Sequence, residues 1–135
     1  MGTALLPADY HVELIAGREV AKPLPKRHHW IIQARVFREL LKWEGSLDID
    51  VGTEVDMLCG ANRDERLIPD VAAVGRNARY QDGVLVDGAV LAVEIMSPGQ
   101  TIGQLFDKCE KLHASGTRDC WVLWPKKRAS WHYAA

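Results

Sequence analysis

The sequence predicts a mixed β-sheet with helices packed against it, in the α/β or α+β class. Short apolar runs of strand length recur along the chain and are bounded by Gly, Pro or polar residues. Two longer segments instead place apolar residues at helical spacing. The order is strand, helix, three or four strands, helix and strands, which favours such a sheet. With 135 residues the chain can bury one core, and we expect a single domain over residues 1–135.

The first third of the chain contains a predicted strand or small hairpin, followed by the first helix. Residues 11–22 alternate in polarity around a glycine, and the basic segment KPLPKRHH at their end is broken by prolines. From His29 to Trp43 the apolar period becomes helical, and Gly45 is placed to end that helix. Its apolar face carries Ile32, Val36, Leu40 and Trp43.

The middle of the chain is predicted to form strands separated by polar loops. Residues 48–59 form one strand or two short strands, with Gly52 as the break, and residues 62–66 form a polar hairpin loop. Residues 67–74, LIPDVAAV, form the next strand. The proline at position 69 indicates an edge strand or a bulge there.

The last third contains the most apolar strand and the second helix. A surface loop at residues 75–83 leads to residues 89–96, AVLAVEIM, a nearly continuous apolar run that is typical of a central strand. A helix is expected over about 101–115, with Gly116 where a C-terminal glycine belongs. Its apolar side carries Ile102, Leu105, Phe106, Cys109 and Leu112. A strand, a turn and a final strand follow at residues 119–125, 126–128 and 129–135.

Charge and cysteine content exclude several classes of protein. The chain has 17 basic and 18 acidic residues, so a globally basic nucleic-acid binder is not indicated, although a local basic patch remains compatible. The three cysteines form no C-x-x-C pair, which argues against zinc and a disulfide framework and fits reduced thiols in the cytoplasm. The first residues lack a long apolar core and no run approaches membrane-spanning length, so we expect neither a signal peptide nor membrane contact.

Two predicted strands each carry one acid, Asp70 and Glu94. Side chains alternate along a strand, so Glu94 shares its face with Ala92 and Met96. Burying an unpaired carboxylate costs several kcal/mol, so each acid needs a base, backbone donors or a metal. If the strands are neighbours, the two carboxylates lie close together and tend to bind a proton or a divalent cation. Alternatively, each acid lies at a solvated strand end or pairs with an arginine.

Lys108 is placed to approach the same acids from the second helix. It lies roughly 100° from the centre of that helix's apolar face, as does Gln104 one turn earlier. A lysine at such a position can lay its stem on the sheet and hold its amine at the edge. The alternative is an ordinary solvated helix lysine, which spacing alone favours.

An ordered series of short motifs resembles the Uma-two family of restriction-endonuclease-like proteins, a branch of the PD-(D/E)xK nuclease superfamily. The resemblance covers nearly the whole chain. It implies five site residues, namely an acid, a histidine, two further acids and a lysine. The segments VELIAG, HWIIQARVFREL, IPDVAAV, VEIMSP and DKCEKLHASGTRDCWVLWP place them at Glu13, His29, Asp70, Glu94 and Lys108.

The resemblance implies a restriction-endonuclease-like fold and metal-dependent hydrolysis of phosphodiester bonds, with DNA as the expected substrate. Asp70 and Glu94 would hold Mg²⁺ or Mn²⁺, and Lys108 would stabilise the developing negative charge. Glu13 would be a third acid, or else an ordinary solvated strand residue. His29 and Gln104 are candidate substrate contacts, with capping or packing as the alternative for His29.

The sequence also departs from the family pattern. The superfamily's usual lysine would fall at Met96, and Gln104 and Leu112 stand where the family commonly has Asp and Tyr. A protein that binds or assembles on a nuclease-like fold without turnover therefore remains an alternative. A hydrolase that cleaves sugars with a carboxylate pair is a third, although no aromatic pattern for a sugar cleft is present. The tryptophans near the end are expected in the core or in the contact of a homodimer: Trp121, Trp124 and Trp131.

Overall fold

A five-stranded mixed sheet forms the centre of the protein. The computed structural model describes residues 11–22, 24–60 and 62–134. The sheet has the strand order β11-β10-β9-β6-β3, in which β9 and β10 are parallel and the other neighbours are antiparallel. Its strands are β3 (Ile49–Thr53), β6 (Val71–Gly75), β9 (Leu91–Ile95), β10 (Asp119–Trp124) and β11 (Ala129–Ala134). The apolar run at residues 89–96 therefore supplies the central strand, as its composition predicts.

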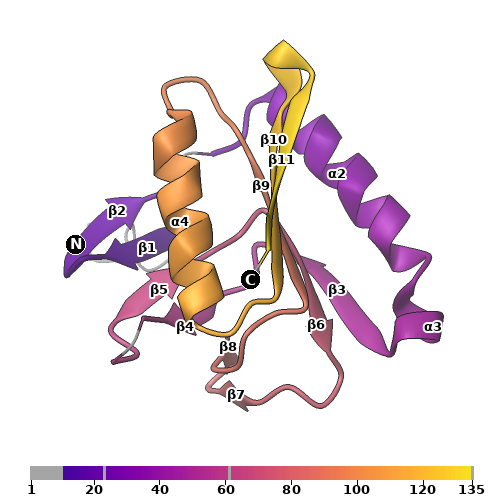
Figure 1. Ribbon diagram of the computed structural model, residues 1–135, viewed down its shortest axis with the longest axis vertical. Coiled ribbons are helices and arrows are strands. Elements are labelled where there is room, and N and C mark those ends of the chain that lie inside the picture. The colour runs from indigo at the N-terminus through magenta and orange to yellow at the C-terminus, as the bar shows by residue number, and fades with distance from the viewer. Residues whose placement is uncertain (1–10, 23, 61, 135) are drawn as a thin grey trace, which may run out of the picture.

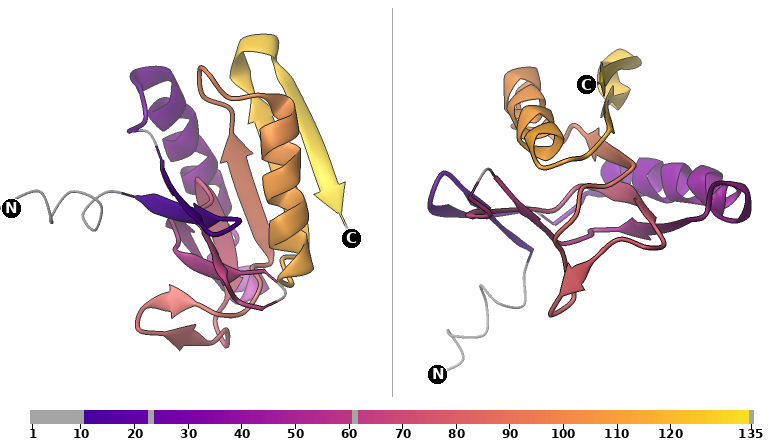
Figure 2. Two further views of the ribbon diagram at one scale, coloured as in Figure 1. Left: turned by 90° about the vertical axis from the view of Figure 1, so that its left-hand side faces the viewer. Right: turned by 60° about the horizontal axis from the view of Figure 1, so that its bottom comes forward.

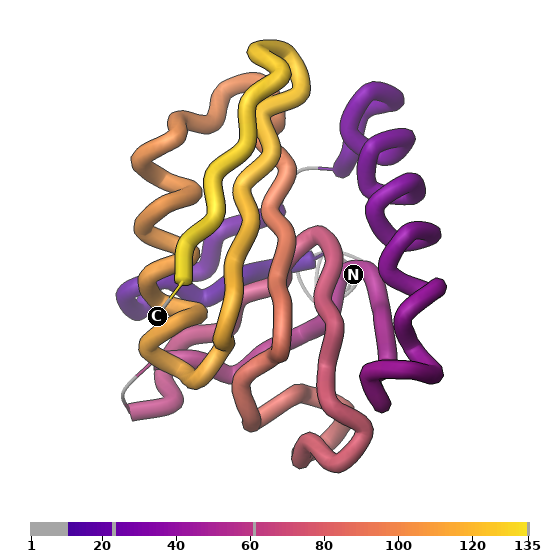
Figure 3. Tube along the Cα trace, turned by 45° about the vertical axis from the view of Figure 1, so that its right-hand side comes forward, coloured from indigo at the N-terminus to yellow at the C-terminus, as the bar shows by residue number. Residues whose placement is uncertain are grey.

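Helices cover both faces of this sheet (Figure 1). They are α2 (Arg27–Leu41), the short α3 (Glu44–Leu47) and α4 (Ile102–Ala114), with a 3₁₀ helix, η2 (Pro125–Lys127), in the hairpin of β10 and β11. One face packs against α2, whose Ile32, Val36 and Leu40 contact Val71, Val93 and Ile95. The opposite face packs against α4, through Leu105, Cys109 and Leu112. Figure 3 shows α2 running beside β3 and β6.

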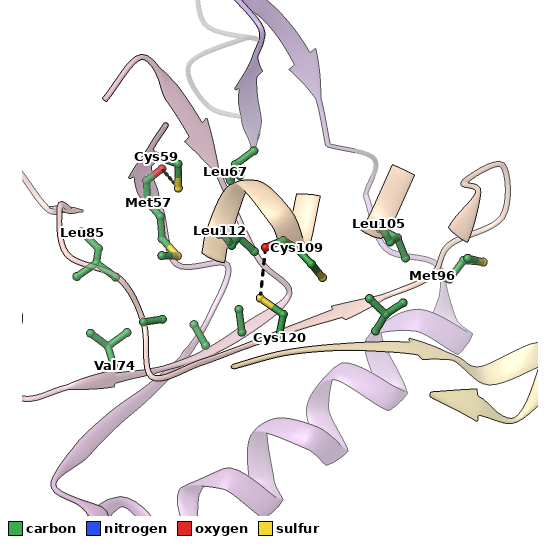
Figure 4. Packing of buried hydrophobic residues seen from close by; sticks show 14 residues of the cluster. Met57, Cys59, Leu67, Val74, Leu85, Met96, Leu105, Cys109, Leu112 and Cys120 are labelled. Carbon is green, nitrogen blue, oxygen red and sulfur yellow. Dashed lines mark hydrogen bonds between the residues drawn. The ribbon is translucent and has the colours of Figure 1, made fainter. Parts of the chain in front are cut away.

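A second sheet lies on the α4 side of the first (Figure 2). The sequence patterns did not distinguish the strands of the two sheets. Its order is β2-β1-β5-β4-β8-β7. The strands are β1 (Val12–Ile15), β2 (Arg18–Ala21), β4 (Met57–Cys59), β5 (Glu65–Leu67), β7 (Tyr80–Gln81) and β8 (Val84–Leu85). Met57, Leu67 and Leu85 from this sheet pack in one cluster with Leu112 and Cys109 of α4 (Figure 4). The main core is thus enclosed between the two sheets.

The predicted strand at residues 67–74 is in fact two strands in two different sheets. The chain leaves the second sheet after Leu67 and enters the first at Val71. Pro69 has no backbone N–H and cannot continue a ladder, so it marks the crossing. The crossing segment, Ile68–Asp70, therefore lies where the two sheets meet.

Three smaller boundaries also differ from prediction. The first helix ends at Leu41, and Gly45, which was expected to end it, lies inside α3. The left-handed residue that closes this helical region is Asp48, with φ 54°. The predicted surface loop at residues 75–83 contains the two-residue strand β7. β7 pairs with β8 in a local hairpin across Asp82 and Gly83, both of which have positive φ. An Asp-Gly pair is a typical hairpin signal, and the loop prediction did not use it.

Cys59, Cys109 and Cys120 are buried free thiols. Across residues 11–22, 24–60 and 62–134, none of the helices combines the length and apolar character needed to cross a bilayer.

Gly88→Ala should destabilise the protein because two backbones meet at this position. A Cβ on residue 88 would overlap the carbonyl group of Gly116, which follows α4 and has φ +104°. Overpacking of this kind costs roughly 1–3 kcal/mol or more. Gly45→Ala is the matched control, because its Cβ would meet no atom within 4 Å. Urea denaturation of both variants tests this expectation, and equal stabilities would contradict the close approach.

Candidate functional site

A cavity of about 520 Å³ lies where the β1–β2 hairpin, the ends of β6 and β9 and the start of α4 come together. All six residues singled out from the sequence line it: Glu13, His29, Asp70, Glu94, Gln104 and Lys108. These residues come from four different elements and from the crossing segment, so only the folded chain assembles them.

Asp70 and Glu94 approach each other because β6 and β9 are antiparallel neighbours. The ladder pairs Val71 with Val93, and extending it by one position puts Asp70 opposite Glu94. Opposed residues of an antiparallel pair present their side chains on the same face. Both residues line the cavity, and both are only 2% exposed.

Asp70 is held as an ionised carboxylate by several donors. Its Oδ2 accepts a hydrogen bond from the Ile95 amide at 2.6 Å and lies 3.3 Å from His29 Nε2. The ammonium of Lys22 lies 2.8 Å from Oδ1, but that oxygen has no aligned hydrogen-bond donor. Burial would raise the pKa of Asp70, but the His29 ring and the Lys22 charge hold it well below its ordinary value.

The pKa of Glu94 is shifted in the opposite direction from that of Asp70. Its Oε1 lies 3.0 Å from Lys108 Nζ, whereas its buried Oε2 has no hydrogen-bond partner among the described residues. Burial raises the pKa of Glu94 to about 7, against the opposing charge of Lys108. Two neighbouring acids thus differ in proton affinity because their partners differ.

Lys108 is buried, so the interpretation of it as a solvated helix lysine is wrong. It is 8% exposed, and its amine lies 2.5 Å from Glu13 Oε2 and 3.3 Å from the Ile68 carbonyl oxygen, which accepts its hydrogen bond. Burial would lower the pKa of Lys108, but the charges of Glu94 and Glu13 raise it above its ordinary value. The ammonium therefore stays charged between two acids.

Glu13 is likewise buried rather than solvated. Its Oε2 accepts a hydrogen bond from the Ile68 amide at 2.7 Å as well as contacting Lys108. The acid thus binds both the crossing segment and the lysine. In this geometry Glu13 positions the amine of Lys108.

His29 and Gln104 have defined structural contacts. His29 begins the buried face of α2, and its Nδ1 is buried without a hydrogen-bond partner among the described residues. Gln104 lines the cavity, but its side-chain oxygen accepts from the Thr101 amide in the capping box of α4. One turn after His29, Gln33 donates to the Asp70 carbonyl at 2.8 Å.

Lys22 and Glu54 belong to the site but were not found from the sequence. Lys22 follows β2, and its Nζ lies 2.6 Å from both Glu54 Oε2 and the Ile68 carbonyl oxygen, in addition to its contact with Asp70. Burial would lower the pKa of Lys22, but the charges of Asp70 and Glu94 raise it. In the sequence Lys22 is only one cation of the basic segment KPLPKRHH, so its spacing carried no distinct signal.

The donor set fits a hard divalent cation held by two carboxylates. Asp70 Oδ1 and Glu94 Oε2 are buried acceptors that receive no hydrogen bond from residues 11–22, 24–60 and 62–134, and both residues line one cavity. Within the part of the chain that the structure describes, no group of three or more His, Cys, Asp or Glu side chains is placed to hold a metal ion. Mg²⁺ commonly takes only one or two carboxylates and keeps several waters, so two ligands suffice.

Glu94→Gln should change the pH dependence of stability in metal-free protein. The pKa of Glu94 is raised from 4.5 to about 7 on folding, so its stabilising protonated form is lost as pH rises through 7. Between pH 5 and pH 8 the parent should lose stability relative to Glu94→Gln, by on the order of 3 kcal/mol. Denaturation in chelator measures this difference. The exposed change Glu39→Gln is the control, and a pH-independent difference for Glu94→Gln would contradict the assignment.

Comparison with known proteins places this arrangement in a family. Residues 3–135 match the model of the Uma2 family, whose description is "Putative restriction endonuclease". A crystal structure described as "a putative nuclease belonging to DUF820", from Anabaena variabilis ATCC 29413, superposes with a TM-score of 0.79 at 21% identity. The match covers 91% of this chain and 71% of that one. No curated protein matches the sequence. The structural likeness confirms the predicted fold class, and the chain belongs to the Uma2 family.

Proposed function

We propose that the protein is a metal-dependent endonuclease that hydrolyses phosphodiester bonds of DNA, with Mg²⁺ or Mn²⁺ held by Asp70 and Glu94. One observation carries the proposal. Two buried carboxylates, each with one oxygen that accepts no hydrogen bond from the described residues, line a cavity beside a buried lysine, in a chain whose family is described as "Putative restriction endonuclease". Two carboxylates and an amine are the groups that such hydrolysis requires.

Each residue has a distinct role in this proposal. The bound cation would supply Lewis acidity, which polarises the phosphate and lowers the pKa of a coordinated water. Asp70 remains ionised and provides the stronger ligand, whereas Glu94 is able to hold or release a proton near neutral pH. Lys108 provides a fixed positive charge for the phosphate oxygens in the transition state. Glu13 orients that amine from the other side.

A second cavity supports an anionic, extended substrate. It has a volume of about 470 Å³ and shares His29 and residues 97–100 with the first. Its lining adds Lys26, His28 and Lys126, so it is basic although the whole chain is nearly neutral. The beginning of α2 lies here, and a helix N-terminus favours phosphate. A nucleic-acid backbone could thus cross the basic cavity on its way to the two acids.

Cleavage should depend on the proposed ligands and on Lys108. Nicking of supercoiled DNA should require Mg²⁺ or Mn²⁺ and fail in Ca²⁺, which adopts looser coordination. Asp70→Asn should abolish nicking and weaken metal binding. Lys108→Met should lower the rate by roughly 10²–10³ while metal binding persists. Lys42→Met, at an exposed position outside the cavity, is the control. Rapid cleavage by Lys108→Met would refute the proposed role.

The basic cavity should contribute affinity rather than chemistry. Replacing both Lys26 and Lys126 by Met removes two charges from it. DNA binding should weaken, and the slope of log affinity against log salt should become less steep by roughly 1–2. Mn²⁺ binding should stay unchanged because neither lysine lines the cavity of Asp70 and Glu94. Fluorescence anisotropy at several salt concentrations, with Lys42→Met as control, tests this, and an unaltered slope would count against DNA passing through this cavity.

A second candidate function is DNA binding or assembly without turnover. Gln104 favours it, because it replaces the family's usual acid and its side-chain oxygen caps α4. If the parent binds DNA but cleaves neither DNA nor RNA in Mn²⁺, this candidate is the better one.

A homodimer and a cytoplasmic location also remain our proposals. Large apolar side chains are exposed along α2 and α3, namely Trp30, Leu41, Trp43 and Leu47. Near the end of the chain Trp121 is 37% exposed, whereas Trp124 and Trp131 pack partly buried against the core. The apolar surface that a dimer would cover is therefore better sought on α2 and α3 than at the end of the chain. Light scattering of the purified protein determines the mass.

A further inference from the structure

The ammonium of Lys22 is enclosed by oxygens of the kind that hard cations bind. Its Nζ lies 2.6 Å from Glu54 Oε2, 2.6 Å from the Ile68 carbonyl oxygen and 2.8 Å from Asp70 Oδ1. Carboxylate and carbonyl oxygens are also the ligands that divalent cations take in proteins. Lys22 thus occupies a cation position on Asp70 Oδ1, which accepts no aligned hydrogen bond from the described residues.

The charge of the cluster leaves room for one more cation. Four carboxylates, on Glu13, Glu54, Asp70 and Glu94, face the ammonium groups of Lys22 and Lys108. With these four carboxylates and two ammonium groups all ionised, their formal charge is two minus. A divalent ion would neutralise it. Among the described residues, Asp70 Oδ1 and Glu94 Oε2 are the carboxylate oxygens of this cluster that accept no hydrogen bond, and the Lys22 ammonium lies 2.8 Å from the first.

We propose that Lys22 is a resident cation that competes with the divalent ion for Asp70 and so keeps the metal affinity of the free protein low. The inference rests on the proposed function, since it requires Asp70 and Glu94 to be metal ligands. Two cations on one carboxylate oxygen repel each other strongly in a site this buried. The lysine stem is long and flexible, and Lys108 also donates to the Ile68 carbonyl, so this carbonyl keeps a donor when the Lys22 amine withdraws.

The test compares Mn²⁺ affinities by isothermal titration calorimetry on chelator-treated protein without DNA. Lys22→Met and Lys22→Gln remove the resident charge and should bind Mn²⁺ on the order of tenfold more tightly, or more. Lys22→Arg keeps the charge and should bind like the parent. Lys26→Met removes a charge from the neighbouring basic cavity and is the control for a general field effect. It should also bind like the parent.

Three results would overturn the proposal. Equal affinities in all variants would show that Lys22 does not compete, while the metal site itself stands. If Lys26→Met raised the Mn²⁺ affinity as much as the Lys22 variants do, the effect would be due to net charge and not to competition at Asp70. Absence of Mn²⁺ binding from every variant would refute both the competition and the metal site. Should the Lys22 variants fail to fold, Mn²⁺-soaked crystals of the parent decide: the Lys22 amine must leave Asp70 Oδ1 when the ion is present, and its persistence there would refute competition.

Discussion

The structure depends on hydrogen bonds to the buried backbone N–H and C=O groups of the crossing segment, Ile68–Asp70. Between the two sheets this segment belongs to neither ladder, yet buried N–H and C=O groups need partners. Side chains supply most of them. Glu13 accepts from the Ile68 amide, Lys22 and Lys108 donate to the Ile68 carbonyl, and Gln33 donates to the Asp70 carbonyl. The charged groups of the candidate site are therefore also the groups that hold the two sheets together.

Because the charged groups of the site bind one another and the crossing segment, the protein tolerates several buried charges there. An isolated buried ion is costly, but each ammonium here contacts two carboxylates and a carbonyl oxygen. The acids are in turn made unequal by their partners. Asp70 receives the Ile95 amide and stays ionised, whereas Glu94 has one oxygen without a hydrogen bond and a raised pKa. Neighbouring carboxylates with separated pKa values are typical of hydrolytic sites. The same interactions therefore stabilise the fold and separate the pKa values of Asp70 and Glu94.

Local patterns predicted those parts of the structure that depend on local physics. Helical period located α2 and α4, and the apolar run at residues 89–96 located the central strand, because burial imposes these periods directly. The sequence motifs brought Asp70, Glu94 and Lys108 to attention. The division of residues 67–74 between two sheets could not be predicted, because it depends on which distant strands pair with each half. Lys22 and Glu54 were missed because a lysine after a hairpin and a glutamate after a strand are ordinary until the fold brings them together.

The position of Lys108 illustrates how a helix residue can place an amine where a strand residue would otherwise supply it. A lysine two residues after Glu94 would project from the same face of β9, and Met96 occupies that position. Met96 instead packs with Leu105 in the main core cluster, which includes residues of α4. The amine reaches Glu94 from Lys108 of α4, at 3.0 Å. Its placement therefore depends on the packing of α4 through Leu105, Cys109 and Leu112. A substitution in that apolar face would shift α4 and with it the Lys108 ammonium, although the lysine itself is unchanged. The packing of the core therefore also determines the geometry of the site.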